Sequence, residues 1–334
     1  MNEERILLAH GNGGRFMREL IGELFARHLG NPALDTDADA VHLPDLAGDI
    51  LVTTDGFTVQ PIEFPGGNLG SLAVHGVVND LAVAGAQARY FTLSAIIEEG
   101  LEVALLDRLI ASFAAAAREN GVAVAAGDTK VVRHGEGGGL YLSVAGIGVR
   151  EATTDLSMKR IAPGDVVLVS GPVGDHGVSV MLAREQFGLS GGLLSDSASV
   201  LPLARAAWDL PGLKFMRDPT RGGLATVCHE IAHATGCAVV LDQGAVPVRG
   251  EVVAVCEMLG YDPYFLACEG RVVAVATPAA AAEVLARWRA LPAGAEAAVI
   301  GRIDAGAARL ILETELGGRR VLEELEDDPL PRIC

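Results

Sequence analysis

The stretch LGSLAVHGVVNDLAVA, residues 69–84, is an apolar run of small residues that predicts a buried helix. It carries Asp80, and a lone carboxylate inside an apolar helix costs free energy unless it is paired or binds a metal. Strands and helices alternate around it to about residue 312, which favours an α+β or α/β fold over an all-α or all-β one. The other predicted elements are strands at 50–54, 90–97, 122–126, 140–149, 166–170, 238–241 and 272–276, a turn at 127–129, and helices at 101–120, 222–235, 249–258 and 279–290.

The chain divides into two predicted domains and a tail. Its composition changes near 151–163, so we expect an N-terminal domain over 1–152 and a C-terminal α/β domain over 153–316. The segment 317–334 is acidic and proline-containing, which is typical of a mobile tail. Fully extended, those 18 residues would span up to about 60 Å.

Composition and charge exclude several classes of function. The 334 residues carry a net charge of −17, which argues against nucleic acids or anionic membranes as partners because their phosphates would repel the chain. No apolar run reaches the roughly 18 residues of a membrane-spanning helix, and the N-terminal MNEER lacks the basic start of a signal peptide. We therefore expect a cytoplasmic protein. None of the five cysteines forms a CxxC pair, and four lie in apolar segments, as buried free thiols do.

Three aspartates lie where strands end or turns begin. Asp55 follows the strand at 50–54, Asp80 lies in the apolar helix, and Asp128 lies in the predicted turn. Several carboxylates around a nucleotide suit Mg²⁺, which takes oxygen ligands and bridges phosphates. Lys130 would supply compensating positive charge. Each aspartate alone is as well explained as a cap of a turn or helix, so only the three together predict a metal–nucleotide site.

Two glycine-rich loops are candidates for contact with phosphates. They are HGNGG at 10–14 and GPVG at 171–174. Neither matches the P-loop pattern, and no GxGxxG follows a strand, so a standard P-loop or Rossmann site is not supported. Backbone N–H groups in such loops can still bind phosphates without the motif, but each loop alone is a weak signal.

The segment RDPTRGGL, residues 217–224, opens a predicted helix. Thr220 is a good candidate for its N-cap, and the free N–H groups of a helix start attract anions. Arg217 and Arg221 flank that start and would strengthen the binding of an anion. An ordinary capped helix start explains the same residues equally well.

The segment HEIAH, residues 229–233, matches the HExxH pattern of zinc proteases. The third ligand of the extended motif would fall at Val239, although a distant carboxylate such as Glu251 would complete other zinc sites. The apolar residues of this predicted helix form one stripe, and both histidines lie on the opposite face. We therefore expect a solvated polar face here, and not a zinc site.

Four motifs occur in a characteristic order: TDGF at 54–57, NDLA at 79–82, GDTK at 127–130 and DPTRGGL at 218–224. Together they resemble the ATP-binding superfamily of aminoimidazole ribonucleotide synthetase, selenophosphate synthetase and thiamine-monophosphate kinase. The terminal PRIC, residues 331–334, resembles one branch of it, the HypE family of hydrogenase maturation factors, which are carbamoyl dehydratases. The resemblance covers essentially the whole chain.

The resemblance implies an α+β, PurM-like two-domain fold. Its N-terminal sheet would form a barrel with the sheet of a second copy in a homodimer, and ATP would bind between the two domains. The implied Mg²⁺ ligands are Asp55, Asp80 and Asp128. The implied ATP site adds Asn79, Asp218, Arg221 and the loop residues Gly11, Asn12, Gly13 and Gly14.

The resemblance also implies a reaction. A HypF-type carbamoyltransferase would load a carbamoyl group onto Cys334, and the enzyme would dehydrate it to a thiocyanate. A HypC–HypD-type scaffold complex would then deliver cyanide to the iron of a [NiFe] hydrogenase. Turning an amide into a nitrile requires expelling the carbonyl oxygen, which phosphorylation by ATP makes a good leaving group. Glu269 matches a family glutamate suited to take the amide proton, and Lys130 would steer the phosphate charge.

Two other functions stay open at this level. Selenophosphate synthetase is the nearest enzyme, but its reactive Cys or Sec lies in the N-terminal glycine loop, where this chain has only His10 and Asn12 as polar side chains. A small-molecule synthetase would also give Cys334 no role. A non-catalytic ATP-binding scaffold for assembly is the alternative outside enzymes.

Overall fold

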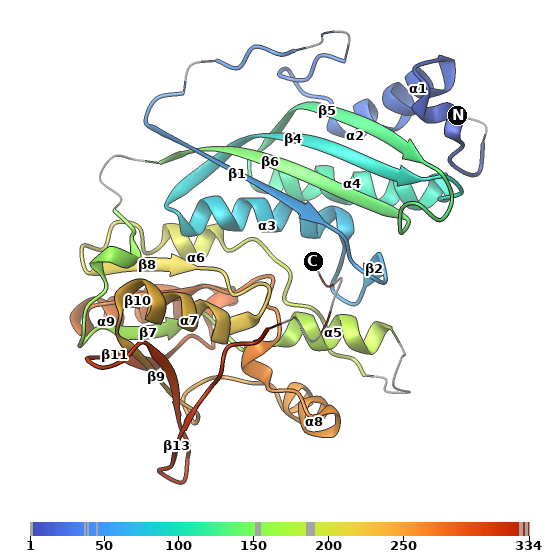
Figure 1. Ribbon diagram of the computed structural model, residues 1–334. Helices are drawn as coiled ribbons and strands as arrows, with labels where there is room; N and C mark the ends of the chain where they lie inside the picture. Colours follow the sequence, from blue (N-terminus) through green and yellow to red (C-terminus); the bar gives the residue numbers. More distant parts are fainter. Residues whose placement is uncertain are drawn as a thin grey trace.

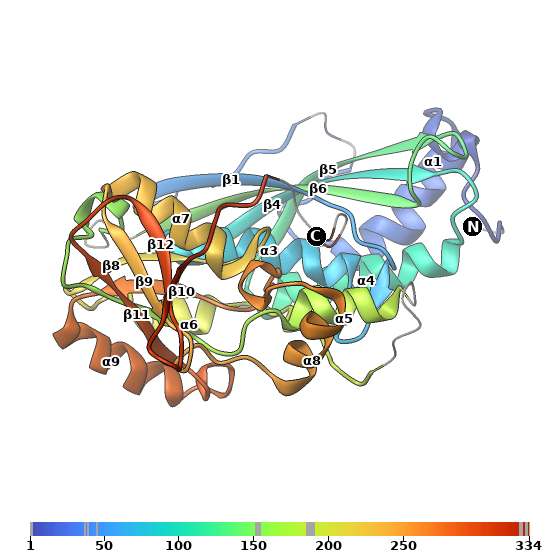
Figure 2. The same cartoon turned by 60° about the horizontal axis from the view of Figure 1, so that its bottom comes forward.

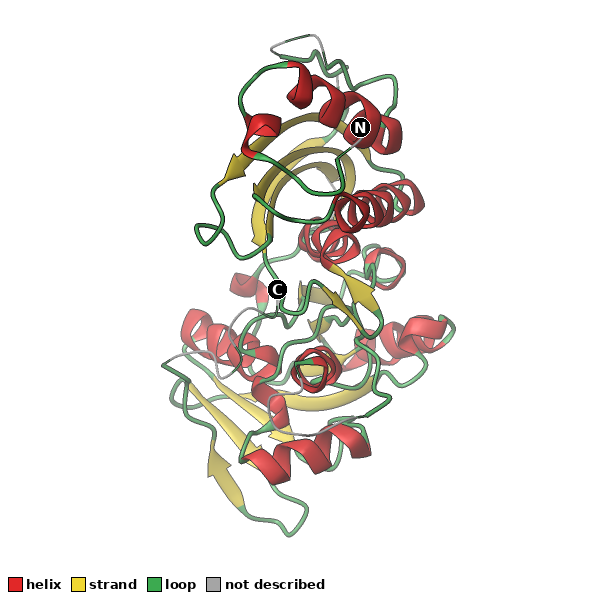
Figure 3. Cartoon of the chain, turned by 90° about the vertical axis from the view of Figure 1, so that its right-hand side faces the viewer, coloured by secondary structure: helices red, strands yellow, loops and turns green. Residues whose placement is uncertain are grey.

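The computed structural model describes residues 3–36, 38, 40–44, 46–150, 155–184, 191–326, 330 and 333. Within that part the chain folds into two halves, each built on its own sheet, that stack along the long axis of the molecule (Figure 3). Helix α3, Leu69–Val83, lies between them (Figure 1). Two sheets with helices packed on their faces give the α+β arrangement that the alternating pattern predicts.

The first half is a four-stranded sheet in the order β1-β6-β4-β5, covered on one face by helices α3 and α4 (Figure 1). The pair β4–β5 is parallel, whereas β1–β6 and β4–β6 are antiparallel. Short helical turns of the N-terminal segment pack beside β5. The elements are η1 (Leu8–Gly11), α1 (Arg15–Leu20), η2 (Ile21–Ala26), α2 (Arg27–Leu29), β1 (Asp49–Phe57), β2 (Glu63–Phe64), β3 (Gly67–Asn68), α3 (Leu69–Val83), β4 (Ala86–Glu98), α4 (Val103–Glu119), β5 (Ala123–Val132) and β6 (Leu140–Arg150).

The predicted helix at 69–84 is confirmed as α3. Its N-cap is Asn68, whose Oδ1 accepts hydrogen bonds from Gly70 N at 2.9 Å and Ser71 N at 3.1 Å. Most of its residues are buried, because the sheet, α4 and the second half surround it. Gly70 permits the close crossing with α4, since a Cβ there would lie 2.0 Å from the carbonyl oxygen of Leu109. A helix that is apolar on all sides is expected in such a sandwiched position.

Two expected breaks in the strands do not occur. The predicted turn at 127–129 lies inside β5, and β1 continues through Asp55-Gly56 to Phe57. In both places the residues pair in register with a neighbouring strand, Asp128 with Ser94 and Asp55 with Val144. The pairing of long strands outweighs the local preference of Gly and Asp for turns.

The second half is a seven-stranded sheet in the order β13-β12-β9-β11-β7-β10-β8. All its pairs are antiparallel except β9–β12. The predicted helices at 222–235, 249–258 and 279–290 are confirmed within one or two residues at their ends. The elements are η3 (Met158–Arg160), β7 (Val166–Val169), α5 (Asp175–Ala183), α6 (Leu201–Arg205), β8 (Leu213–Arg217), α7 (Gly223–Thr235), β9 (Ala238–Asp242), α8 (Gly250–Leu259), η4 (Pro263–Phe265), β10 (Val273–Ala276), α9 (Pro278–Arg289), η5 (Pro292–Gly294), β11 (Ala298–Asp304), β12 (Arg309–Glu313) and β13 (Arg319–Val321).

The hydrophobic core runs through both halves. One buried cluster joins residues of α3, α4 and the first sheet to α6, α9 and one face of the second sheet. A second cluster lies on the other face of that sheet, beneath α7, and includes Leu224, Val227 and Ile231. Three of the cysteines predicted as buried free thiols are buried, Cys228, Cys256 and Cys268, and Cys237 is half-buried. A continuous core between the halves fixes α3 against the second half, and with it Asp80.

The C-terminal segment is ordered further than the sequence suggests. Residues 319–321 form β13, and the Leu322 amide donates to the Leu310 carbonyl at 3.0 Å, so the second domain extends past the expected boundary at 316. The segment leaves the sheet only at Glu323. Leu330 and Ile333 are 4% and 3% exposed, which does not fit a tail that is solvated along its length. Both contact α5, Ile333 through His176 and Leu330 at Gly177, and Figure 2 shows α5 beside α8 below the first sheet.

Candidate functional site

A cluster of carboxylates lies where β1 and α3 meet the second half. Asp80 of α3 accepts a hydrogen bond from Thr53 Oγ1 of β1 at 2.7 Å. Burial raises the pKa of Asp80, and the nearby Asp55 raises it further. Asp218 directly follows β8 and is 7% exposed; its burial, with the repulsion of Asp80 next, raises its pKa to about 7. Acidic groups that repel one another at a partly buried site form a donor set that a divalent cation would stabilise.

Asp80 and Asp218 line a cavity of about 570 Å³ between the two halves. Its walls come from β1, α3, η3 and β8, with Arg217 and Thr220 at one side. That volume lies within the usual range of about 300–1,000 Å³ for small-molecule and cofactor sites. The fold therefore brings Asp80 and Asp218, as well as Thr53, to a cavity large enough for part of a nucleotide.

Asp128 and Lys130 lie apart from this cluster. They belong to β5, at the opposite edge of the sheet from β1, and register places Asp128 three strand spacings from Asp55, on the order of 14 Å. Asp55 pairs with Val144, whose buried side chain is on the face of the sheet that the helices cover. Asp128 pairs with the exposed Ser94, on the open face. Within one chain, the expected triad of metal ligands is thus not assembled.

The N-terminal glycine loop also belongs to the β5 edge. A Cβ on Gly11 would lie 2.9 Å from Val131 Cβ, so the loop packs directly against β5. Gly13 has a φ of +76°, and Gly13 and Gly14 have no neighbouring heavy atom within 4 Å of a Cβ position. Asn12, between Gly11 and Gly13, is exposed. The loop, Asp128 and Lys130 therefore form a second group of predicted site residues, separate from the carboxylate cluster.

Asn79 joins the two halves. Its Nδ2 donates to the carbonyls of Ala198 at 3.1 Å and Glu269 at 3.3 Å, and its Oδ1 accepts from Val200 N at 2.8 Å. The side chain is 1% exposed. Both polar atoms of the amide are used in these contacts, so Asn79 lies in the contact between the two halves.

In the segment 218–224, the N-cap of the helix is a glycine and not the threonine. The helix starts at Gly223, and its N-cap is Gly222, whose φ is +70°. Thr220 is therefore not the N-cap, in contrast to the sequence expectation; its carbonyl instead accepts from Gly223 N at 2.9 Å. A Cβ on Gly223 would lie 2.5 Å from the carbonyl oxygen of Leu266, so only glycine fits the close approach. Arg221 is exposed at this turn.

The second glycine loop, residues 171–174, does not fit a phosphate cradle. Gly174 N donates to Cys268 Sγ at 3.2 Å and Val173 N donates to Pro247 O at 3.0 Å. A Cβ on Gly171 would lie 3.2 Å from the guanidinium of Arg271. These N–H groups and this space are therefore used by the protein itself.

Glu269 is buried beside the carboxylate cluster. Its side chain is 1% exposed, and its backbone N donates to Asp196 Oδ1 at 3.1 Å. Its carbonyl accepts from Asn79, the residue next to Asp80, and Cys268 N donates to Pro219 O at 2.9 Å, next to Asp218. These two hydrogen bonds connect Glu269 and its neighbour Cys268 to the segments that carry Asp80 and Asp218.

His176 was not singled out from the sequence. Its Nε2 lies 2.5 Å from the carbonyl oxygen of Ile333, the penultimate residue, and its Nδ1 lies 2.8 Å from Ser195 Oγ. Burial lowers the pKa of His176, so the ring is neutral at neutral pH. Ser195 and the adjoining Asp196 contact His176 and Glu269 respectively, so the end of the tail and Glu269 meet at one segment. The only sequence signal is a histidine at the start of an otherwise apolar helix.

The histidines of the HEIAH segment do not lie on a solvated face. Both are on α7, but His229 is 6% exposed and only His233 is open to solvent. Residues 322–324 cross this face, and the Leu322 backbone hydrogen-bonds the His229 ring. Periodicity places the histidines opposite the apolar stripe correctly, but it cannot show that a later segment covers them.

Comparison with known proteins places this geometry in a family. Residues 36–150 match the N-terminal domain of AIR synthase related proteins, and residues 162–312 match their C-terminal domain. The chain is 44% identical over 329 residues to the carbamoyl dehydratase HypE of Azotobacter vinelandii, which covers 98% of this chain and 96% of that one. The chain belongs to the HypE family of carbamoyl dehydratases. The HypE of Escherichia coli K12 is 43% identical over 98% of this chain and 99% of its own.

Solved HypE structures agree with the fold. A crystal structure of hydrogenase maturation protein HypE in complex with ATP superposes with a TM-score of 0.93 at 42% identity, covering 98% of this chain and 99% of that one. HypE in a HypE–HypF complex gives a TM-score of 0.81 at 38% identity, covering 92% and 99%. A thiamine monophosphate kinase from Aquifex aeolicus, at 17% identity and a TM-score of 0.61, shares the fold alone.

Family membership confirms the HypE resemblance, the two-domain PurM-like fold and the activity of an ATP-dependent carbamoyl dehydratase. It does not favour selenophosphate synthesis or a non-catalytic scaffold. Among the described residues, no helix is long and apolar enough to cross a membrane.

Proposed function

We propose that this HypE-family chain dehydrates a carbamoyl group on its own Cys334, at the junction of the two halves. The observation that carries the proposal is the contact of Ile333, next to Cys334, with the buried His176. Ser195 contacts His176, and the adjoining Asp196 contacts the backbone of Glu269. Hydrogen bonds to Asn79 and Pro219 then connect residues 268–269 to the neighbours of Asp80 and Asp218. A tail end that reaches this junction would place its thiol beside both acid–base and phosphate-binding groups.

The reaction balances through phosphorylation of oxygen. The carbonyl oxygen of the S-carbamoyl group takes the γ-phosphoryl group of ATP, and ADP leaves. Both N–H protons must leave: one is lost as the oxygen is phosphorylated, and a base removes the other while the C–O bond breaks, so the products are a thiocyanate and phosphate. Buried Glu269 is our choice for that base, and Lys130 our choice for the cation that faces the phosphate.

The donor set of the carboxylate cluster fits Mg²⁺. Asp80 and Asp218, together with Asp55, would hold the ion, and it would neutralise charge on the phosphates. Within one chain, Asp218 would therefore stand where the resemblance implies Asp128. The raised pKa values of Asp80 and Asp218 support this arrangement, because both carboxylates gain from a nearby cation.

We further propose that the site is completed by a second copy of the chain. The open face of the first sheet exposes Ile50, Val52 and Ile96 at 57%, 69% and 39%, which is an apolar surface suited to an interface. Closing this sheet against its twofold mate would bring the β5 edge of one chain beside the β1 edge of the other. Asp128, Lys130 and the glycine loop would then face the carboxylate cluster of the partner.

The partners follow from the chemistry of the tail. A HypF-type carbamoyltransferase would supply the carbamoyl group, and a HypE–HypF complex known for a relative supports this choice. A HypC–HypD-type scaffold would accept the cyanide. These assignments, and a cytoplasmic location, stay predictions.

Mass spectrometry of the C-terminal peptide tests the proposed reaction. The chain is incubated with a HypF-type carbamoyltransferase, carbamoyl phosphate and ATP. We expect a carbamoyl adduct on Cys334, followed by a product lighter by one water. Omission of ATP from a pre-carbamoylated sample should stop the reaction at the first adduct. Adducts on other cysteines only, or ATP turnover with an unmodified tail, would contradict the proposal.

A further inference from the structure

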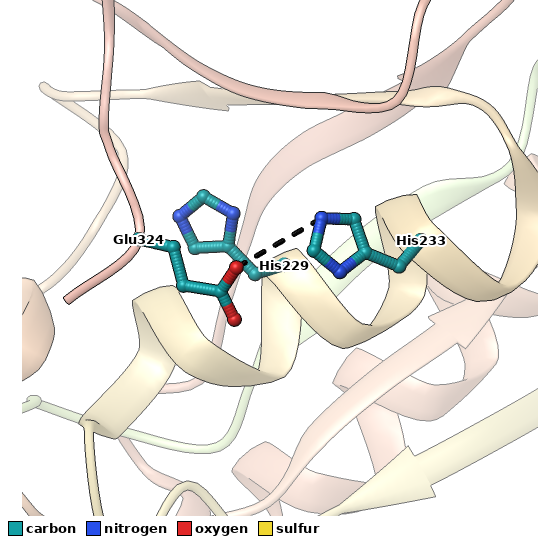
Figure 4. A group of neighbouring side chains, drawn as sticks. All are labelled: His229, His233 and Glu324. Carbon is teal, nitrogen blue, oxygen red and sulfur yellow. Dashed lines mark ion pairs between the residues drawn. The ribbon is translucent and has the colours of Figure 1, made fainter. Parts of the chain in front are cut away.

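His229, His233 and Glu324 converge on one point of the surface (Figure 4). Each offers one donor atom, and the three donor atoms lie within 4.8 Å of one another. The histidines are one helical turn apart on α7, and Glu324 comes from the segment that crosses α7 after β13. Glu324 Oε2 already lies 3.9 Å from His233 Nε2. We propose that these residues form a binding site for a zinc-class divalent cation.

His229 carries the strongest argument. It is 6% exposed, and its Nε2 is buried with no hydrogen-bond partner among the described residues. The Leu322 backbone also hydrogen-bonds the ring. Metal-binding histidines usually have a backbone carbonyl or carboxylate on one nitrogen and the metal on the other. A cation bound by the ring would add a partner to this buried side chain.

The other two donors can move to complete the site. Zinc–nitrogen and zinc–oxygen bonds of about 2.0–2.2 Å require donors roughly 3.3 Å apart, so the cluster must contract. The side chains of His233 and Glu324 are 58% and 55% exposed, and each can rotate without disturbing the core. The acidic Glu323 also faces His229 and adds attraction for a cation. Two imidazoles and one carboxylate, with one position open to water, are a usual ligand set for zinc.

The geometry does not fit a zinc protease. In HExxH enzymes the glutamate after the first histidine serves as the general base beside the metal. Here that residue is Glu230, which forms an ion pair with Arg217 at 3.2 Å. Arg217 lines the cavity of the carboxylate cluster, so Glu230 is directed towards the nucleotide site and away from the histidine pair. The cation would therefore be a structural ion and not a catalytic one.

The cation would hold the start of the C-terminal segment against α7. Glu324 lies ten residues before Cys334 and just after the last residue held by the second sheet. A metal ion bound by both Glu324 and α7 would hold Glu324 in place. The ten residues after it, about 35 Å long when fully extended, would then set the greatest distance of Cys334 from that point. Metal occupancy would thus limit how far Cys334 can travel from its own site.

Zinc binding to the purified full chain tests this inference. We expect one zinc per chain to remain after dialysis against a competing chelator, measured by mass spectrometry. His233→Ala and Glu324→Gln alter exposed side chains, so the fold should persist, and each should weaken zinc binding by about tenfold or more. The matched controls His134→Ala, an exposed histidine elsewhere, and Glu326→Gln, two residues along, should bind zinc as the unaltered chain does.

Hydrogen exchange locates the ion. Added zinc should slow amide exchange in residues 322–326 and in α7 of the unaltered chain, but not of Glu324→Gln. Zinc binding that survives both His233→Ala and Glu324→Gln would point to another ligand such as a cysteine thiolate, and would overturn the proposal. No zinc retained by the unaltered chain, or retention without slower exchange at 322–326, would overturn it as well.

Discussion

At the scale of single residues, the buried carboxyl of Asp218 costs stability at neutral pH. Its carboxyl is buried among other acids, and its pKa is raised to about 7 from an ordinary value of 3.8. The folded state therefore binds a proton that the unfolded state has lost between those two pH values. Stability contributed by that group is present below the ordinary pKa and falls as pH rises towards 7.

The variant Asp218→Asn should accordingly be more stable than the unaltered chain at pH 8 without divalent cations. We expect a gain of roughly 1–3 kcal/mol, because each unit of pKa shift corresponds to about 1.4 kcal/mol. The gain should shrink at pH 5, and binding of Mg²⁺-ATP should weaken. Thermal unfolding in EDTA at both pH values measures this effect. A variant that is less stable than the unaltered chain at pH 8 would contradict the assigned environment.

Glu269 gives a prediction about chemistry and not stability. In Glu269→Gln the backbone contacts with Asp196, Ala198 and Asn79 should persist, because they involve only main-chain atoms of residue 269. ATP binding should stay within about twofold, whereas dehydration should fall by about 10²-fold or more, the usual contribution of a general base. Quantifying carbamoyl and cyano forms of the tail peptide checks this. Normal thiocyanate formation in the variant would exclude Glu269 as the base.

At the scale of elements, Asn79 ties α3 to the second half. Asn79→Ala should lose three hydrogen bonds to the second half and leave the buried Val200 N–H without the acceptor it has in the unaltered chain. We expect the free energy of unfolding to fall by about 2–4 kcal/mol. Chemical denaturation measures the loss, with the exposed Asn12→Ala as a matched control. An equal, small change in both variants would show that Asn79 does not join the halves.

Sequence patterns predict the elements well where periodicity is strong. The helix at 69–84 is recovered because its apolar run is too long for a strand, and the strand at 90–97 because its buried apolar residues alternate with exposed ones. The turn at 127–129 is wrong because Gly127 and Asp128 pair with β4, a partner that is distant in sequence. The cap at Thr220 is wrong because contact with the carbonyls of Tyr264 and Leu266 requires glycine at 223. Local preference cannot foresee either contact.

The candidate site could be predicted only in part. Asp80 and Asp218 were identified by motif and meet in one cavity, whereas Asn79, from the same motif, holds the domains together. His176 was missed because its role depends on Ile333, which lies 157 residues later in the chain. The burial of His229 by residues 322–324 is not predicted for the same reason. Contacts made by the end of the chain carry no local signal in the segments they touch.

At the scale of the whole molecule, the predicted site residues fall into two groups. Asp55, Asp80 and Asp218 lie at the β1 side, and Asp128 with Lys130 lies at the β5 edge. Strand order keeps them apart in one chain, and the exposed apolar face of the sheet suits a second chain. We propose that each active site combines the β1 side of one chain with the β5 edge of its partner.

Complementation between Asp80→Asn and Asp128→Asn tests that claim most directly. The two variants are co-expressed with different tags, the mixed dimer is purified, and ATP-dependent thiocyanate formation is measured. Each variant alone should be inactive, and the mixed dimer should recover about half the activity of the unaltered dimer, since one of its two sites is intact. A dimer of the unaltered chain with an Asp80→Asn/Asp128→Asn double variant should be inactive. An inactive mixed dimer, with half activity in that second dimer, would contradict the account.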